Sequence, residues 1–286
     1  MTGYSNFTIL FNQRVGSSAI VSMLSAQEGI HVPLFEGLDW RHFAANHRDT
    51  TLANVISDVF ATGTYDKDSA HDFLFSAHST QTKSIGFKIR IFGHIPDLVP
   101  VLLKHRVKVF VLSRRDFVEM VSSLYVSEMG QFDQDQVALT QHPQFEVVKM
   151  LAADKTRYLD DLDRLRIEVR HAEFARTAVR TVRDWKRLVR SAEVLHKSGI
   201  DIIPIYYEDF AADRVGFIRN FMVHLGFPPD RPVVDKSRFE KVMKSPARAK
   251  LLGLYRHPLW LRVLYLRFVY GRERKKLERL RGTGTV

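Results

Sequence analysis

An apolar run that passes through a polar loop directly into a helix lies near the start of the chain. The stretch FTILFNQRVGSSAIVSMLSAQEGI covers residues 7–30. Its first five residues predict a buried strand, and residues 19–27 have helical spacing. A buried strand that ends in a tight polar corner and continues at once as a helix is typical of a layered α/β protein.

The same alternation continues along the chain. Further apolar, β-branched-rich runs predict buried strands at residues 84–91, 107–112 and 201–206. Segments with helical spacing lie at residues 52–60, 96–105 and 117–129. Because strands that alternate with helices pair in parallel through crossover connections, we expect an α/β fold with a parallel sheet flanked by helices.

The domain organisation follows from what lies between and after these elements. Residues 145–196 have helix-like periodicity, so we expect a helical insertion or cap over about residues 130–197. Trp185 within it is expected in the core. No internal repeat and no Gly/Ser-rich linker marks a boundary, so the sequence predicts a single domain over residues 1–286 with a basic helical tail at about 244–286.

Composition limits the classes of protein. The 286 residues carry a net charge of +11, yet the segment 244–281 alone holds twelve Lys or Arg and two Glu, a net charge of +10. The rest is nearly neutral, so the whole surface is not expected to bind polyanions. The absence of cysteine excludes disulfides, thiolate metal ligands and cysteine nucleophiles. No secretion signal precedes the first strand, so we expect a cytoplasmic protein.

The first loop has the chemistry of an anion site. A helix N-terminus presents unpaired N–H groups and partial positive charge. Gly16 lets the backbone close around an oxyanion, Ser17 and Ser18 add hydroxyls, and Arg14 adds charge. The Walker signature is absent, because the glycine is followed by Ser-Ser-Ala. An alternative stays open at this point, in which Ser17 is only a helix cap and Gly16 only a turn residue.

A second strand-to-helix corner repeats the pattern. In VFVLSRRDFVEMVSSLY a buried strand ends near residue 112, Arg114 follows it, and a helix begins. Arg114 is expected at the carboxyl end of the sheet, where open α/β sheets bind ligands. Ser122 and Ser123 lie two turns along the helix. Two such corners suggest a ligand with two separated phosphate-like groups. Two alternatives stay open: Arg114 pairs with a carboxylate of the protein, and Ser122 is an ordinary residue on the helix surface.

Three blocks of the chain resemble the sulfotransferases that use 3′-phosphoadenosine 5′-phosphosulfate (PAPS). NQRVGSSAIVSML resembles their 5′-phosphosulfate loop, with Val15 where a serine is usual. VLSRRDFVEMVSSLY resembles their 3′-phosphate motif, with either Ser122 or Ser123 in the serine position. IYYEDFAADRVGFIRNFMVHLGFP resembles their late block, with Arg214 in place of a proline. The family's basic segment that closes over the nucleotide has no clear match in this sequence, and VMKSPARAK is the nearest basic loop.

The resemblance implies a P-loop-like sheet, PAPS as co-substrate and the bisphosphate PAP as product, without a metal. It assigns the 5′-phosphosulfate to the loop residues and the 3′-phosphate to Arg114 with Ser122 or Ser123. The donor-loop residues are Arg14, Val15, Gly16, Ser17 and Ser18. Arg14 would also stabilise charge during transfer. The bacterial and carbohydrate branch is the nearest in style, which implies a hydroxyl of a carbohydrate, glycoconjugate or glycolipid as acceptor.

A general base is also expected near the acceptor hydroxyl. Glu36 follows the first helix where the carbohydrate branch tends to place an acidic residue, and it is the first candidate. A solvated loop carboxylate is an equally open interpretation of Glu36. His31 and His42 are reserve candidates. Lys88 points away from Phe87 on its strand and has two interpretations: it approaches the donor, or it lies in solvent near a strand end, which is the first expectation.

The basic tail has three interpretations. It packs as a helix with its arginines outside, it contacts an anionic membrane surface peripherally, or it attracts an anionic acceptor. No nucleic-acid motif accompanies it. Two rival functions remain at this point: a small-molecule or nucleotide kinase with a degenerate phosphate loop, and a non-catalytic lipid-binding protein that acts through the tail.

Overall fold

The protein forms two compact units, which are described one at a time. The computed structural model describes residues 3–12, 15–39, 52–62, 82–90, 95–129, 166–236 and 247–280. The first unit comprises residues 1–113, 186–237 and 273–286, and the second comprises residues 114–185 and 238–272.

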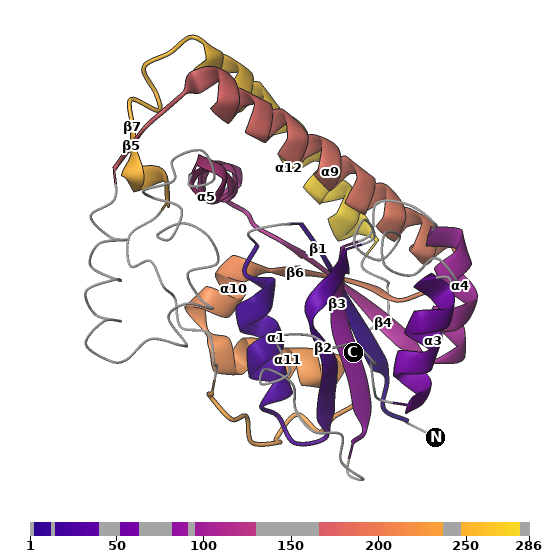
Figure 1. Cartoon of the computed structure of the whole chain (residues 1–286). Helices are drawn as coiled ribbons and strands as arrows, with labels where there is room; N and C mark the ends of the chain where they lie inside the picture. Colours follow the sequence, from indigo (N-terminus) through magenta and orange to yellow (C-terminus); the bar gives the residue numbers. More distant parts are fainter. Residues whose placement is uncertain are drawn as a thin grey trace. The chain divides into compact units, whose positions relative to one another are not determined.

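A five-stranded parallel sheet forms the centre of the first unit (Figure 1). Its strands are β1 (Asn6–Phe11), β2 (Ile30–Asp39), β3 (Ser84–Arg90), β4 (Val107–Ser113) and β6 (Ile202–Tyr206). They lie in the order β2-β3-β1-β4-β6, and all described pairings are parallel. The predicted α/β fold with a parallel sheet flanked by helices is confirmed.

Helices cover both faces of this sheet. They are α1 (Ser17–Ser25), α3 (Leu52–Thr62), α4 (Ile95–Lys104), α10 (Tyr207–Ala212) and α11 (Arg214–His224). In Figure 1, α1 and α11 lie on one face and α3 and α4 on the other. The ring of Phe221 in α11 stacks on Phe110 of β4 at 3.7 Å, and Phe60 in α3 lies 5.2 Å from Phe87 of β3. Burial on both faces explains why these strands are continuous apolar runs.

The strand order places a topological switch point at β1. From β1 the chain continues towards β2 and β3, whereas β4, on the other side of β1, leads to β6. Phe11 and Leu112 are register partners, so β1 and β4 end side by side. Open α/β sheets bind ligands at the carboxyl ends of the strands at such a point. The first loop and the chain after Ser113 both leave the sheet there.

Strand β2 is not predicted by the sequence pattern. Its sequence, IHVPLFEGLD, contains Pro33 and Gly37, which interrupt an ordinary strand pattern. An edge strand tolerates proline because one side of its backbone has no partner strand, and β2 is at the edge of the sheet. The pairing of β2 with β3 shifts register on both sides of Leu34. Glu36 therefore lies in a strand and not in a loop.

The second unit is built mainly from helices. Its elements are α5 (Phe117–Met129), β5 (Ile167–Glu168), the first part of α9 (His171–Lys197), the short 3-10 helix η2 (Ala247–Lys250), β7 (Leu251–Leu252) and the first part of α12 (Leu259–Arg279). The ring of Tyr270 lies 5.1 Å from Trp185 and 5.1 Å from Phe117. Trp185 is thus a core residue, as predicted. Helix α9 covers residues 171–197 of the segment expected as a helical insertion, and residues 130–165 lie outside the described residues.

Candidate functional site

The loop after β1 ends in a helix N-terminus that no side chain caps. Gly16 is the N-cap residue of α1, has a left-handed backbone with φ of 83°, and no side chain accepts a cap hydrogen bond there. The first turn of α1 contains no acidic residue. The interpretation of Ser17 as the helix cap is therefore wrong, because Gly16 occupies that position. Val15 and Ser17 are buried, and Ser18 is half-buried. The N–H groups of this turn are available to an anion.

The ring of Tyr207 lies against Gly16 in the loop after β1. Tyr207 is the first residue of α10 and directly follows β6. A Cβ atom added at Gly16 would overlap the ring of Tyr207. Glycine is required here twice, because residues with a Cβ rarely adopt the left-handed backbone and because the ring leaves no space for one.

A buried lysine lies beside this helix N-terminus. The side chain of Lys88 in β3 is 1% exposed, and its Nζ donates a 2.8 Å hydrogen bond to Ser18 Oγ. The Nζ also lies 5.4 Å from the centre of the Phe11 ring. Of the two interpretations of Lys88, the solvent position is wrong, because β3 is an interior strand and the side chain is buried. A fixed ammonium group strengthens the anion-binding character of the α1 N-terminus.

Two buried polar side chains stand at the ends of β1 and β4. Asn12 follows β1 and is 5% exposed, and Ser113 ends β4 and is fully buried. Neither the Asn12 amide nor the Ser113 hydroxyl has a hydrogen-bond partner among the described residues. A buried polar atom without a partner costs about 1–3 kcal/mol, and a polar ligand at this edge would remove that cost.

In the second unit, the corner that contains Arg114 has a fixed backbone. The Tyr270 hydroxyl donates a 2.7 Å hydrogen bond to the Arg114 carbonyl. The Asp116 carboxylate accepts from the Glu119 N–H at 3.0 Å, which caps the start of α5. Arg114 itself is half-buried. The backbone conformation that carries the Arg114 guanidinium is thus set by a helix cap and a core tyrosine.

The basic segment before β7 lies against the start of α5. The Glu119 carboxylate accepts from the N–H of Ala247 at 2.8 Å and from the N–H of Arg248 at 3.2 Å. Arg248 Nη1 lies 2.9 Å from Asp116 Oδ2. The described part of the segment VMKSPARAK therefore brings a second arginine to the corner that follows β4. Only its basic composition marked this segment in the sequence.

The two candidate serines of α5 differ in environment. Ser122 is fully buried, and its Oγ has no hydrogen-bond partner within the described ranges. Ser123 is half-buried. An unpartnered buried hydroxyl is suited to a ligand contact, whereas a half-buried one is more accessible, so both serines stay candidates.

The candidates for the general base fall in different places. Arg14 and His42 lie outside the described residues. Glu36 lies on β2 between Leu34 and Leu38, which pair with Phe87 and Ile89, so its backbone is level with Lys88. The Glu36 side chain is outside the described part. His31 pairs with Ile85 at the amino end of β2. The loop after β1 lies at the opposite, carboxyl ends of the strands.

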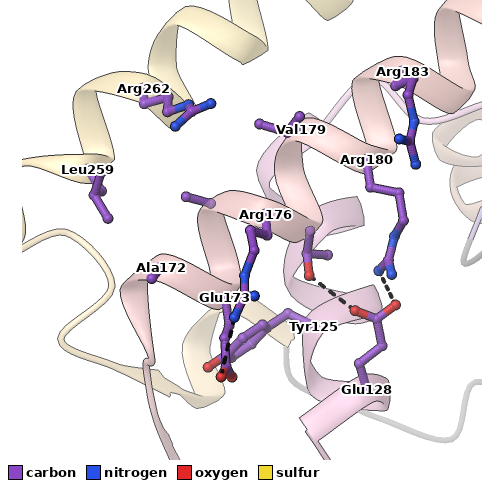
Figure 2. A pocket seen from close by; sticks show the side chains of 12 residues that line it. Tyr125, Glu128, Ala172, Glu173, Arg176, Val179, Arg180, Arg183, Leu259 and Arg262 are labelled. Atoms are coloured by element: carbon purple, nitrogen blue, oxygen red, sulfur yellow. Dashed lines mark hydrogen bonds and ion pairs between the residues drawn. The ribbon is translucent and has the colours of Figure 1, made fainter.

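The second unit also contains a pocket of about 1090 Å³, which the sequence analysis did not predict. Its described lining comes from α5, α9 and the first turns of α12: Tyr125, Glu128, Ala172, Glu173, Ala175, Arg176, Thr177, Val179, Arg180, Arg183, Leu259 and Arg262. Figure 2 shows arginines of α9 along one side of it. Three of them recur at the spacing of one helix face, which is the sequence signal for this lining.

Hydrogen bonds and ion pairs organise this pocket. Glu128 pairs with Arg180 and accepts a 3.1 Å hydrogen bond from Thr177 Oγ1 (Figure 2). Tyr125 Oη accepts from the Arg170 N–H at 2.9 Å, and burial raises the pKa of Tyr125. The lining thus contains carboxylate, guanidinium and hydroxyl groups.

Neither the described side chains nor the described helices indicate a metal site or a membrane span. No three His, Asp or Glu residues lie together as metal ligands in the part of the chain that the structure describes. Among the described helices, none has the length and apolar composition needed to cross a bilayer.

Comparisons with known proteins give one finding to report. No protein-family model matches the chain, and no curated protein matches its sequence. A solved structure of a sulfotransferase from Alicyclobacillus acidocaldarius is similar with a TM-score of 0.43 and 15% identity, over 96% of this chain and 95% of that one. This similarity assigns no function to the chain.

Proposed function

We propose that this protein is a sulfotransferase that moves a sulfonate group from PAPS to a hydroxyl of a carbohydrate or glycoconjugate. The observation that carries the proposal is the uncapped N-terminus of α1 with the buried Lys88 ammonium 2.8 Å from Ser18 Oγ. Such a site suits the clustered negative charge of a phosphosulfate. The three sequence blocks that resemble PAPS-dependent enzymes support this choice of nucleotide.

In the proposed donor site, the 5′-phosphosulfate binds at the first turn of α1. The backbone N–H groups after Gly16, the hydroxyls of Ser17 and Ser18, and the cations of Lys88 and Arg14 face its oxygens. The acceptor oxygen forms a bond to sulfur as the bond from sulfur to the 5′-phosphate oxygen breaks, and PAP leaves. These donors stabilise the charge that develops on the leaving phosphate.

The proposed 3′-phosphate contacts come from the corner after β4. Arg114 binds the phosphate with two N–H groups, and Ser122 or Ser123 adds a hydroxyl. Arg248 adds a second cation through its place beside Asp116. These contacts would distinguish PAPS from nucleotides that lack a 3′-phosphate. The proposal needs no metal.

Glu36 is the proposed general base that takes the proton from the acceptor hydroxyl. Its backbone is level with Lys88 in the carboxyl half of the sheet. His31 is less suited to this role, since it pairs with Ile85 at the opposite edge.

A hydroxyl-rich acceptor fits the chemistry of the pocket in the second unit. Its carboxylates, guanidinium groups and Tyr125 offer both hydrogen-bond acceptors and donors to sugar hydroxyls. Thr177→Val would remove the hydroxyl that donates to Glu128. We expect this variant to raise the KM for a saccharide acceptor and to leave PAP affinity unchanged.

A thermal-shift comparison of PAP, PAPS, ATP and AMP, each with magnesium or with EDTA, tests the nucleotide. We expect PAP and PAPS to raise the melting temperature most, with or without EDTA. The helix N-terminus would also suit the phosphates of ATP. A larger shift with ATP that depends on magnesium would therefore favour a kinase and overturn the proposal.

A further inference from the structure

The first half of α12 has an apolar face that is open to solvent. Tyr265 is 66% exposed, Phe268 is 68% exposed and Leu261 is 71% exposed. Leu264, 39% exposed, belongs to the same set. These four residues are spaced three or four positions apart, so they form one stripe along the helix. We call this stripe the α12 apolar face.

The α12 apolar face is distinct from the face by which the helix packs. Val263, Val269 and Tyr270 are buried, and Tyr270 packs against Trp185 and Phe117 in the core of the second unit. The helix therefore has one buried apolar stripe that packs in the core of this unit and a second apolar stripe that is exposed. Large aromatic and aliphatic side chains held in water indicate an interaction surface.

Positive charge surrounds the α12 apolar face. Residues 251–272 contain no Asp or Glu. The arginines of this segment are exposed, namely Arg256, Arg262, Arg267 and Arg272. Leu252 and Tyr255, 53% and 59% exposed, extend the apolar surface before the helix begins. The segment thus combines leucines, aromatic rings and arginines without any compensating acid.

We propose that the α12 apolar face docks on an anionic lipid surface. A helix of this kind lies in the plane of the membrane interface, with its apolar residues among the acyl chains and its cations at the phosphates. Tyr265 and Phe268 supply the apolar contact, while Arg262 and Arg267 extend to the headgroups on either side. Each such cation contributes about 1 kcal/mol at an anionic surface.

A second copy of the chain is the other partner considered for this face. Pairing two α12 apolar faces would bring arginines from both copies together in a segment without acidic residues. Like charges in a buried interface are unfavourable, whereas a lipid phosphate neutralises them. The charge pattern therefore favours lipid. The inference does not depend on the proposed sulfonate transfer.

Vesicle sedimentation tests this proposal directly. The full chain is mixed with vesicles of phosphatidylcholine alone or of phosphatidylcholine with phosphatidylserine, at low and high salt. We expect the chain to bind the anionic vesicles and to bind the neutral vesicles at least tenfold more weakly. Binding to the anionic vesicles should be lost at high salt. The variant Tyr265→Ser/Phe268→Ser should bind the anionic vesicles at least tenfold more weakly than the wild type. The variant Arg256→Glu/Arg267→Glu should show the same loss of binding.

A matched control separates this face from general hydrophobicity. Leu103 and Val194 are also exposed apolar residues, 49% and 40% exposed, on other helices. Leu103→Ser/Val194→Ser should bind vesicles as the wild type does, and all variants should unfold with unchanged cooperativity. Absence of vesicle binding, or equal binding to neutral vesicles, would overturn the proposal. A concentration-dependent dimer that Tyr265→Ser/Phe268→Ser abolishes would assign the face to a second copy instead.

Discussion

Lys88 Nζ donates a 2.8 Å hydrogen bond to Ser18 Oγ and so connects β3 to the first turn of α1. Lys88 is 1% exposed, so the ammonium group has been removed from water. A buried cation is costly unless its surroundings stabilise the charge. In the proposed donor site, the anionic ligand at the N-terminus of α1 would stabilise this charge.

Lys88→Met should separate ligand binding from folding. Methionine fills a similar volume without the charge, so we expect the free energy of unfolding to stay the same or to rise. PAP affinity measured by calorimetry should fall at least tenfold, which corresponds to about 1.4 kcal/mol.

Lys83→Met is the matched control for Lys88. Lys83 is exposed, and its Nζ contacts the Tyr4 hydroxyl at 3.3 Å. This variant should bind PAP as the wild type does. If Lys88→Met binds PAP with wild-type affinity, Lys88 has no part in the donor site.

Gly16→Ala should both destabilise the protein and weaken PAP binding. A left-handed residue with a Cβ costs about 1–2 kcal/mol, and overlap with the Tyr207 ring adds a cost of about 1–3 kcal/mol. Gly199→Ala provides the comparison, because Gly199 has a φ of 84° and no atom within 4 Å of an added Cβ. Urea unfolding should show a larger loss for Gly16→Ala, and Tyr207→Ala in the same chain should recover part of it. Equal losses at the two glycines would remove Tyr207 from this account.

Glu36→Gln should lower turnover and leave donor affinity nearly unchanged. The amide keeps the size of the side chain but cannot accept the acceptor proton at neutral pH. Steady-state rates with PAPS and calorimetry with PAP check the two parts separately. Glu28→Gln is the control, since Glu28 is exposed and pairs with Arg231 at 3.2 Å. Full activity of Glu36→Gln would exclude Glu36 as the base.

The sequence predicts most of the sheet because its strands are buried on both faces. Strands β1, β3, β4 and β6 are continuous apolar runs for this reason, and each falls within a residue or so of its predicted range. Strand β2 does not fit this rule. Pro33 and Gly37 interrupt its apolar run and its pairing with β3 shifts register, so the pattern that identifies continuous apolar strands does not find it.

The candidate site is only partly predictable, since several contacts depend on the order of strands. Gly16, Ser17 and Ser18 can be identified from a local motif. Lys88 reaches Ser18 only because β3 lies next to β1, and sequence spacing does not reveal that neighbour. The contact of Arg248 with Asp116 joins residues 132 positions apart. Such contacts follow from tertiary packing and not from periodicity.

His105 should make stability depend on pH. Burial, and secondarily the charge of Lys104, lowers the pKa of His105 below its ordinary value of 6.5. The unfolded chain then binds more protons between the two pKa values, so the free energy of unfolding falls as the pH drops through 6.5. His105→Phe keeps the ring contact with Phe60. Urea unfolding at pH values above and below 6.5 should show a smaller fall in the free energy of unfolding for this variant than for the wild type. Identical pH profiles for the two proteins would contradict this assignment.

We propose that Arg114 recognises the 3′-phosphate by which PAP differs from AMP. Calorimetric titration of PAP and AMP into the wild type and Arg114→Ala tests it most directly, with Arg115→Ala as the exposed neighbouring control. We predict that the wild type and the control prefer PAP by at least about 2 kcal/mol, roughly thirtyfold, and that Arg114→Ala loses most of this preference. A wild type that binds AMP as tightly as PAP, or an Arg114→Ala variant that keeps the full preference, would contradict the account.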